Sequence, residues 1–152
     1  MKQIFTYLLL FIMILISLTC SKEHVNDIYI PNENIVLSES DDTLFLIINN
    51  YRVDHGLSVL KIDSLTTELA AGHVLYMIDK GVLSHDYFSI RANLSHAERV
   101  GEIVAYNYQT PLSMLTAYLG SPPHKAILDN PNFTHIGIST IEDYNCCILT
   151  SY

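Results

Sequence analysis

Two histidines and one glutamate are candidates for chemistry because of the residues around them. His85 lies in the segment L-S-H-D-Y-F, and His124 lies in the segment S-P-P-H-K-A. Glu102 lies between them in G-E-I-V-A, where a glycine and apolar residues flank it. Imidazole and carboxylate groups are ligands that zinc and similar divalent ions accept. The residue types therefore indicate a candidate metal site at His85, His124 and Glu102, although spacing alone does not show that the three meet.

The other histidines lack such settings. The sequence has 7 histidines in 152 residues, and a histidine in isolation most often has a structural role. His73 falls on an apolar helical face, as a core histidine does. We expect no role in the site for the five other histidines, which are His24, His55, His73, His96 and His135.

A metal-dependent hydrolase is one alternative for this set. In it, His85 and His124 would hold the metal and Glu102 would act as general base on the bound water. The sequence contains neither a G-x-S-x-G nor an H-E-x-x-H motif, which are signatures of known hydrolytic mechanisms. We therefore expect binding rather than catalysis, with Glu102 the one candidate base. A second alternative is purely structural, with the histidines and the glutamate forming a buried polar network.

Helical patterns dominate the first part of the chain beyond residue 40. Apolar spacing predicts helices over 42–54 and 64–80, and Gly81 is a typical helix stop. Asp63 or Ser64 can cap the second of these helices. The remaining helical predictions are a loop with helical turns over 81–94, a helix starting at Thr110-Pro111 and ending at Gly120, and a short piece over 124–128.

Extended patterns gather toward the end of the chain. Residues 101–106 predict a short strand, and alternation over 136–141 followed by the segment 146–152 predicts a hairpin with its turn at 142–145. This order of elements indicates an α+β fold with helices covering an antiparallel sheet.

The N-terminus has the pattern of a targeting signal. Lys2 precedes an apolar run from Phe5 to Leu18, which is shorter than the ~20 residues of a membrane span. Cys20 follows, as in bacterial lipoprotein signals. We predict a signal peptide over 1–20 with Cys20 lipidated, a flexible tether over 21–40 and one domain over 41–152. A secreted protein, or one tethered by an uncleaved signal, is the alternative.

Composition excludes several classes. The chain has 8 Lys and Arg against 16 Asp and Glu, a net charge of −8, which argues against a nucleic-acid partner. Hydrophobic residues make up 49%, enough to exclude wholesale disorder. Cys146 and Cys147 are neighbours, and a bond between adjacent cysteines is strained, so we expect packed free thiols.

An ordered series of motifs resembles the CAP superfamily, which includes cysteine-rich secretory proteins, insect venom allergens and plant pathogenesis-related proteins. The match is best to its bacterial secreted branch. The motifs are N-N-Y-R with G-L at 49–57, L-A-A-G-H at 69–73, S-H at 84–85, G-E-I-V-A at 101–105, S-P-P-H-K-A-I-L at 121–128, and N-F-T followed by I-G-I at 132–138.

The resemblance implies an α-β-α sandwich, with helices packed on both sides of a small antiparallel sheet and a surface cleft. It implies that His85 and His124 are the cleft histidines, that Glu102 is the cleft acid, and that zinc or another divalent ion can bind there. Ile103, Pro123 and Lys125 depart from the motifs of the bacterial branch, which have Asn, Gly and Arg there. We expect an extracytoplasmic, membrane-anchored protein whose cleft binds a divalent metal, a small molecule or a partner protein.

Overall fold

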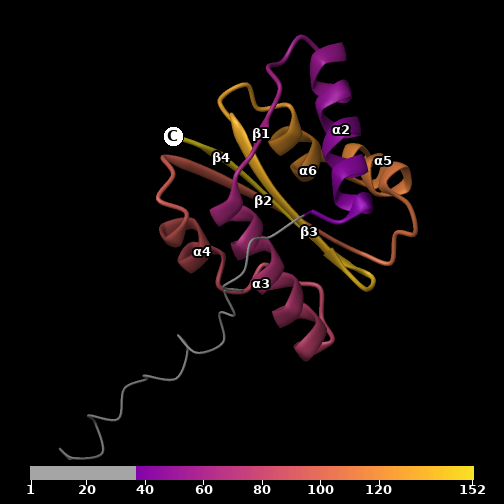
Figure 1. Cartoon of the computed structure of the whole chain (residues 1–152), viewed down its shortest axis with the longest axis vertical. Helices are drawn as coiled ribbons and strands as arrows, with labels where there is room; N and C mark the ends of the chain where they lie inside the picture. The colour runs from indigo at the N-terminus through magenta and orange to yellow at the C-terminus, as the bar shows by residue number, and fades with distance from the viewer. Residues whose placement is uncertain (1–36) are drawn as a thin grey trace, which may run out of the picture.

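The computed structural model describes residues 37–152 (Figure 1). The predicted signal peptide, Cys20 and most of the predicted tether lie outside the described residues. Within the described part, none of the helices combines the length and apolar character needed to cross a bilayer.

Helices and strands are interspersed along the chain. Their bounds are α2 (Glu39–Asp54), β1 (Lys61–Ile62), α3 (Ser64–Lys80), α4 (Phe88–Leu94), β2 (Arg99–Tyr106), α5 (Pro111–Gly120), α6 (Pro122–Leu128), β3 (His135–Ile141) and β4 (Tyr144–Ser151). The prediction for α3 is confirmed at both ends, and α2 begins three residues before the predicted start. The predicted loop over 81–94 contains the short helix α4.

Side-chain caps explain why the helix boundaries are readable from local sequence. The Asp63 side chain accepts a hydrogen bond from the Thr66 amide at the start of α3, and Gly81 ends that helix with a left-handed φ of 64°. Thr110 and Ser113 form a reciprocal capping box at the start of α5. Such caps satisfy amides and carbonyls that a helix end otherwise leaves unpaired.

The strands form one sheet in the order β1-β3-β4-β2. β3 pairs antiparallel with β4, and β4 pairs antiparallel with β2. The predicted hairpin is confirmed, but β4 begins at Tyr144 inside the predicted turn. The sheet is mixed, because the two-residue strand β1, which was not predicted, runs parallel to β3. A strand that short carries no readable alternation.

Helices cover both faces of this sheet, so the α+β sandwich is confirmed (Figure 1). One core lies between the sheet and α2, α5 and α6, with Leu44, Tyr118 and Leu128 among its members. The other core lies against α3 and includes Leu69 and Met77. Side chains of adjacent residues in a strand point to opposite faces.

The two C-terminal cysteines follow this alternation. Cys147 belongs to the core under α2, α5 and α6, and Cys146 belongs to the core under α3. Both are buried free thiols, as predicted. Because they face opposite layers of the sandwich, their side chains are directed away from each other.

Candidate functional site

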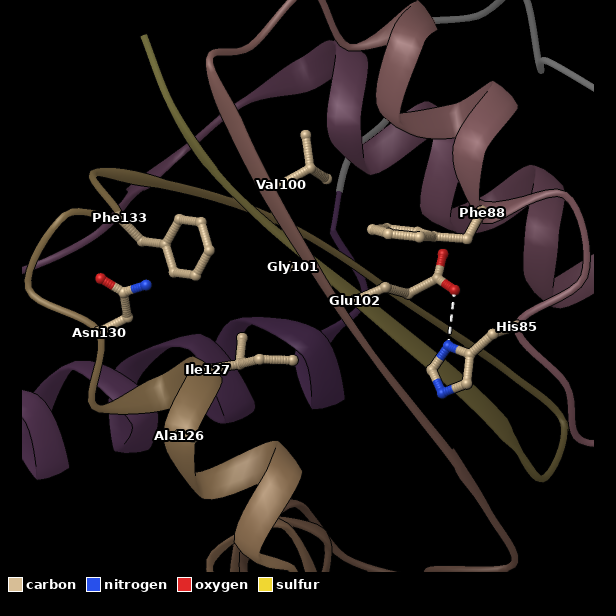
Figure 2. A pocket seen from close by; sticks show the side chains of 9 residues that line it. All are labelled: His85, Phe88, Val100, Gly101, Glu102, Ala126, Ile127, Asn130 and Phe133. Carbon is tan, nitrogen blue, oxygen red and sulfur yellow. Dashed lines mark hydrogen bonds and ion pairs between the residues drawn. The ribbon is translucent and has the colours of Figure 1, made fainter.

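The candidate site is built around Glu102, whose side chain points from β2 toward α4 and the loop before it (Figure 2). Arg91 of α4 donates from Nε to Oε2 at 2.7 Å and from Nη2 to Oε1 at 2.8 Å. The His85 Nδ1 atom lies 2.8 Å from the same Oε1. A carboxylate with these neighbours is an acceptor held by an arginine fork.

Arg91 is the residue of the site that sequence reasoning missed. It is 3% exposed, and its Nη1 also donates to the Asp86 carbonyl at 2.6 Å. Arg91 therefore connects β2 to the loop that carries His85. The only local signal was an arginine six positions after His85, in the segment predicted as a loop with helical turns, and nothing in that pattern identifies its partner.

His73 supports the same loop from α3. Its Nε2 lies 2.8 Å from the Ser84 carbonyl and 4.0 Å from Oε1 of Glu102. As a donor to that carbonyl, Nε2 carries the proton, and the buried Nδ1 has no partner among the described residues. Burial, followed by the charge of Arg91, lowers the pKa of His73. His73 is therefore a core histidine, as expected, but one that positions His85.

Cys146 also approaches the carboxylate, with its Sγ 4.0 Å from Oε2 of Glu102. Burial, followed by the charge of Glu102, raises the pKa of the Cys146 thiol. Because the thiolate is the reactive form of cysteine, this thiol is a packing residue rather than a nucleophile.

A pocket of about 400 Å³ opens beside His85 and Glu102 (Figure 2). Phe88 of α4 borders it on one side, and Ile127, Asn130 and Phe133 border it on the other. Gly101 lies in its floor, and a Cβ there would come within 3.0 Å of the Ile127 side chain. The pocket therefore lies between the two helical layers, at the strand β2.

Arg52 holds in place the segment that forms the pocket wall opposite Phe88. It is fully buried and donates to four carbonyls, those of Ser58, Leu128, Asn130 and Phe133. Burial lowers the pKa of Arg52, and the carbonyl oxygens replace the water that a guanidinium needs. The N-N-Y-R motif thus holds the segment that carries Asn130 and Phe133.

His124 lies in a second pocket, of about 190 Å³, further along β2. Its ring meets the ring of Tyr118 edge-on, with centroids 5.9 Å apart. Burial, followed by the charge of His85, lowers the pKa of His124. The structure therefore joins His85 directly to Glu102 and places His124 in the neighbouring pocket, where it still senses His85 electrostatically.

The three predicted ligands do not form a three-ligand metal centre in this geometry. Over residues 37–152, no group of three or more His, Cys, Asp and Glu side chains is arranged to hold a metal ion. Both oxygens of Glu102 accept from Arg91, whose positive charge opposes a cation at the same carboxylate.

Comparison with known proteins places this geometry in a family. The model of the cysteine-rich secretory protein family, CAP, matches residues 46–150. The chain is 30% identical over 116 residues to the membrane protein YlbC of Bacillus subtilis (strain 168), and 29% identical over 103 residues to YkwD of the same organism. These matches cover 72% and 63% of this chain but only 34% and 40% of YlbC and YkwD.

Solved structures share the fold. An extracellular SCP-domain protein of Bacillus anthracis str. Ames has a TM-score of 0.71 at 24% identity, over 74% of this chain and 40% of that one. An outer surface protein of Borrelia burgdorferi has a TM-score of 0.70 at 20% identity, over 78% of this chain and 97% of its own. The family match spans most of the chain and every motif of the site, so the chain belongs to the cysteine-rich secretory protein (CAP) family.

Proposed function

We propose that this protein is an extracytoplasmic, membrane-anchored CAP domain whose cleft at His85 binds a ligand without catalysing a reaction. The location is supported by the relatives, which are named a membrane protein, an extracellular protein and an outer surface protein. It is also supported by the apolar run before Cys20, which has the pattern of a lipoprotein signal. Lipidation of Cys20 is the form of anchoring that this pattern favours.

The observation that carries the proposal is the state of Glu102. Arg91 and His85 occupy both oxygens of a side chain that is 1% exposed. A general base needs a free lone pair within reach of its proton donor, so this pairing weighs against the hydrolase. The same carboxylate orients the His85 ring, whose Nε2 points away from it (Figure 2).

The purely structural alternative accounts for part of this set. Arg91, Glu102 and His73 are buried and hydrogen-bonded to one another or to the backbone, as in a network that stabilises a fold. His85 differs, because its side chain is 51% exposed at the mouth of a pocket. A half-exposed imidazole held in one orientation beside an apolar cavity is suited to ligand binding.

A divalent ion held by His85 and His124 is the second candidate. The observation that favours it is that the pockets of the two imidazoles lie next to each other along β2. In keeping with this, burial and then the charge of His85 lower the pKa of His124. Neutral imidazole is the form that binds metals. A bound ion would supply a Lewis acid in the cleft.

The test is a ligand screen by thermal unfolding of the full chain in detergent micelles, followed by circular dichroism. Probes are a pool of short peptides, chito-oligosaccharides, palmitate and zinc chloride. Because ligands that bind the native state raise its stability, we expect one class to raise the melting temperature. His55→Ala is the matched control, since His55 is exposed at the end of α2. The proposal fails if no probe acts, or if the shift survives in His85→Ala.

A further inference from the structure

We propose that the edge of β2 opposite β4 is the floor of a groove that binds an extended, uncharged or basic peptide by strand addition. This inference rests on the proposed function, because it names the ligand class of the same cleft. The elements that carry it are the edge strand and the two pockets that follow one another along it.

Within residues 37–152, β2 lies at an edge of the sheet and pairs with β4 alone. Hydrogen bonds at the strand ends show which of its groups face outward. The amide of Asn107 donates to the Asp143 carbonyl, and the amide of Glu98 donates to the Ser151 carbonyl, so odd-numbered residues of β4 face β2. The amide of Thr134 donates to the Thr150 carbonyl, so even-numbered residues of β4 face β3.

This alternation and the register determine which way the backbone N–H and C=O groups of each β2 residue point. Gly101 pairs with Leu149 and Ile103 pairs with Cys147, so these odd-numbered residues hydrogen-bond to β4. The N–H and C=O groups of Val100, Glu102 and Val104 therefore point away from the sheet. Outside the β2–β4 ladder, no hydrogen bond within residues 37–152 uses them. Unpaired groups at two-residue spacing are what an added strand pairs with.

The two pockets lie in series along this edge. Residues 100–102 of β2 line the pocket at His85, and residues 104–106 line the pocket at His124. Figure 2 shows β2 running between the two helical layers, with Phe88 and His85 on one side and Ile127 and Phe133 on the other. The floor of both pockets is thus one strand, and their walls are the two layers.

The spacing and the lining define the peptide. The pocket centres lie about four residues apart along β2, roughly 14 Å at the rise of a strand, and residues four apart in an added strand point to the same side. Phe88, Ile127 and Phe133 make the first pocket apolar. Tyr106, Tyr108 and Tyr118 make the second aromatic. We infer two apolar or aromatic side chains four residues apart.

The charges of the pocket lining and of the whole chain restrict the charge that the peptide can carry. Arg91 pairs with Glu102, which is the one carboxylate among the described residues that line the two pockets. The residues that line the two pockets include neither arginine nor lysine. The chain as a whole carries a net charge of −8, which repels acidic segments. These charges favour an uncharged or basic peptide.

The experiment starts with phage-displayed random dodecapeptides selected against the full chain in detergent micelles. A selected peptide is then synthesised with one backbone N-methyl group at each position in turn. Strand addition predicts a period of two, because only alternate amides face β2. We expect methylation at those positions to weaken binding about fivefold to tenfold, and methylation at the others to change it less than about twofold.

A protein variant tests the same edge. Val100→Pro removes one outward N–H and leaves the ladder to β4 intact, since edge strands tolerate proline where the N–H faces outward. Val100→Ala keeps that N–H and shortens the same side chain. We expect Val100→Pro to weaken peptide binding about fivefold more than Val100→Ala. The methylation series uses the unaltered protein, so it decides the question even if Val100→Pro unfolds.

Four other results of these experiments would contradict strand addition, and each would point to a different explanation. Uniform effects of methylation, or no selected peptide while another probe stabilises through His85, would remove strand addition and leave the proposed function standing. If no probe and no peptide binds, both strand addition and the proposed function are contradicted. Peptide binding seen only after deletion of residues 21–36 would make that segment the occupant. A dimer that a selected peptide dissociates, detected by sedimentation, would assign the edge to a second copy.

Discussion

Arg91 and Glu102 form a buried two-point ion pair between α4 and β2, with nitrogen–oxygen distances of 2.7 and 2.8 Å. Both residues are at most 5% exposed. The pair is central to the cleft, because Glu102 orients His85 while Arg91 holds the Asp86 carbonyl in the same loop. Loss of either partner leaves the other charge buried, which is the costly case for an internal ion pair.

The first prediction concerns the stability of this pair. Arg91→Met and Glu102→Gln should each lower the free energy of unfolding by about 3–5 kcal/mol, because each leaves a buried charge unpaired. The double variant should lose less than the sum of the two, since it contains no unpaired charge. Urea denaturation of the four proteins measures this cycle. Lys61→Met, at an exposed cation of β1, is the control. Additive losses would show that the two charges are not coupled.

The second prediction concerns pH and His73. Burial and the charge of Arg91 lower the pKa of His73 below its ordinary value of 6.5. The charge of Glu102 raises this pKa in part, and the charge of His85 lowers it further. Below pH 6.5, His73 therefore binds more protons in the unfolded chain than in the folded one. The stability due to neutral His73 is complete above about pH 6.5 and is lost as the pH falls through the folded pKa.

Urea denaturation between pH 5 and 7.5 checks this sign. His73→Gln keeps an N–H for the Ser84 carbonyl but does not titrate. It should reduce the slope of stability against pH by up to about 1.4 kcal/mol per pH unit. The pKa of His124 is lowered as well, so His124→Gln is the parallel measurement. An unchanged slope in His73→Gln would contradict the neutral state of His73.

The third prediction belongs to the second candidate, a divalent ion at the two imidazoles. Zinc should then raise the melting temperature of the full chain, and His85→Ala/His124→Ala should lose that rise. Glu102→Gln should lower the affinity for zinc about 10- to 100-fold without abolishing binding. Loss of a carboxylate that orients a ligating histidine has an effect of this size. Equal shifts in the wild type and the double variant would exclude the two histidines as ligands.

The fourth prediction concerns the packing of β3 against α3. A Cβ at Gly137 would lie 2.2 Å from backbone atoms of Thr66 and Thr67, so Gly137→Ala must separate the strand from the helix. We expect a loss of about 3 kcal/mol or more in the free energy of unfolding. Gly120→Ala is the matched control, since no atom of residues 37–152 lies within 4 Å of the added Cβ. Thermal melts that show the two variants to be equally stable would contradict this packing.

The sequence by itself determined the features that depend on neighbouring residues. The Asp63 cap and Gly81 set the ends of α3, and Thr110 with Pro111 set the start of α5. These signals are readable because a capping side chain and the group it satisfies are three residues apart. The ordered motifs also identified the family and singled out His85 and Glu102, which the structure brings into contact.

Only the tertiary structure decided how these residues are grouped. Arg91 meets Glu102, His73 meets the Ser84 carbonyl, and His124 lies in a pocket of its own. The parallel strand β1 exists because Lys61 and Ile62 meet β3, which is more than seventy residues later in the chain. Such pairings depend on how helices and strands pack across the sheet, and local spacing carries no record of that packing.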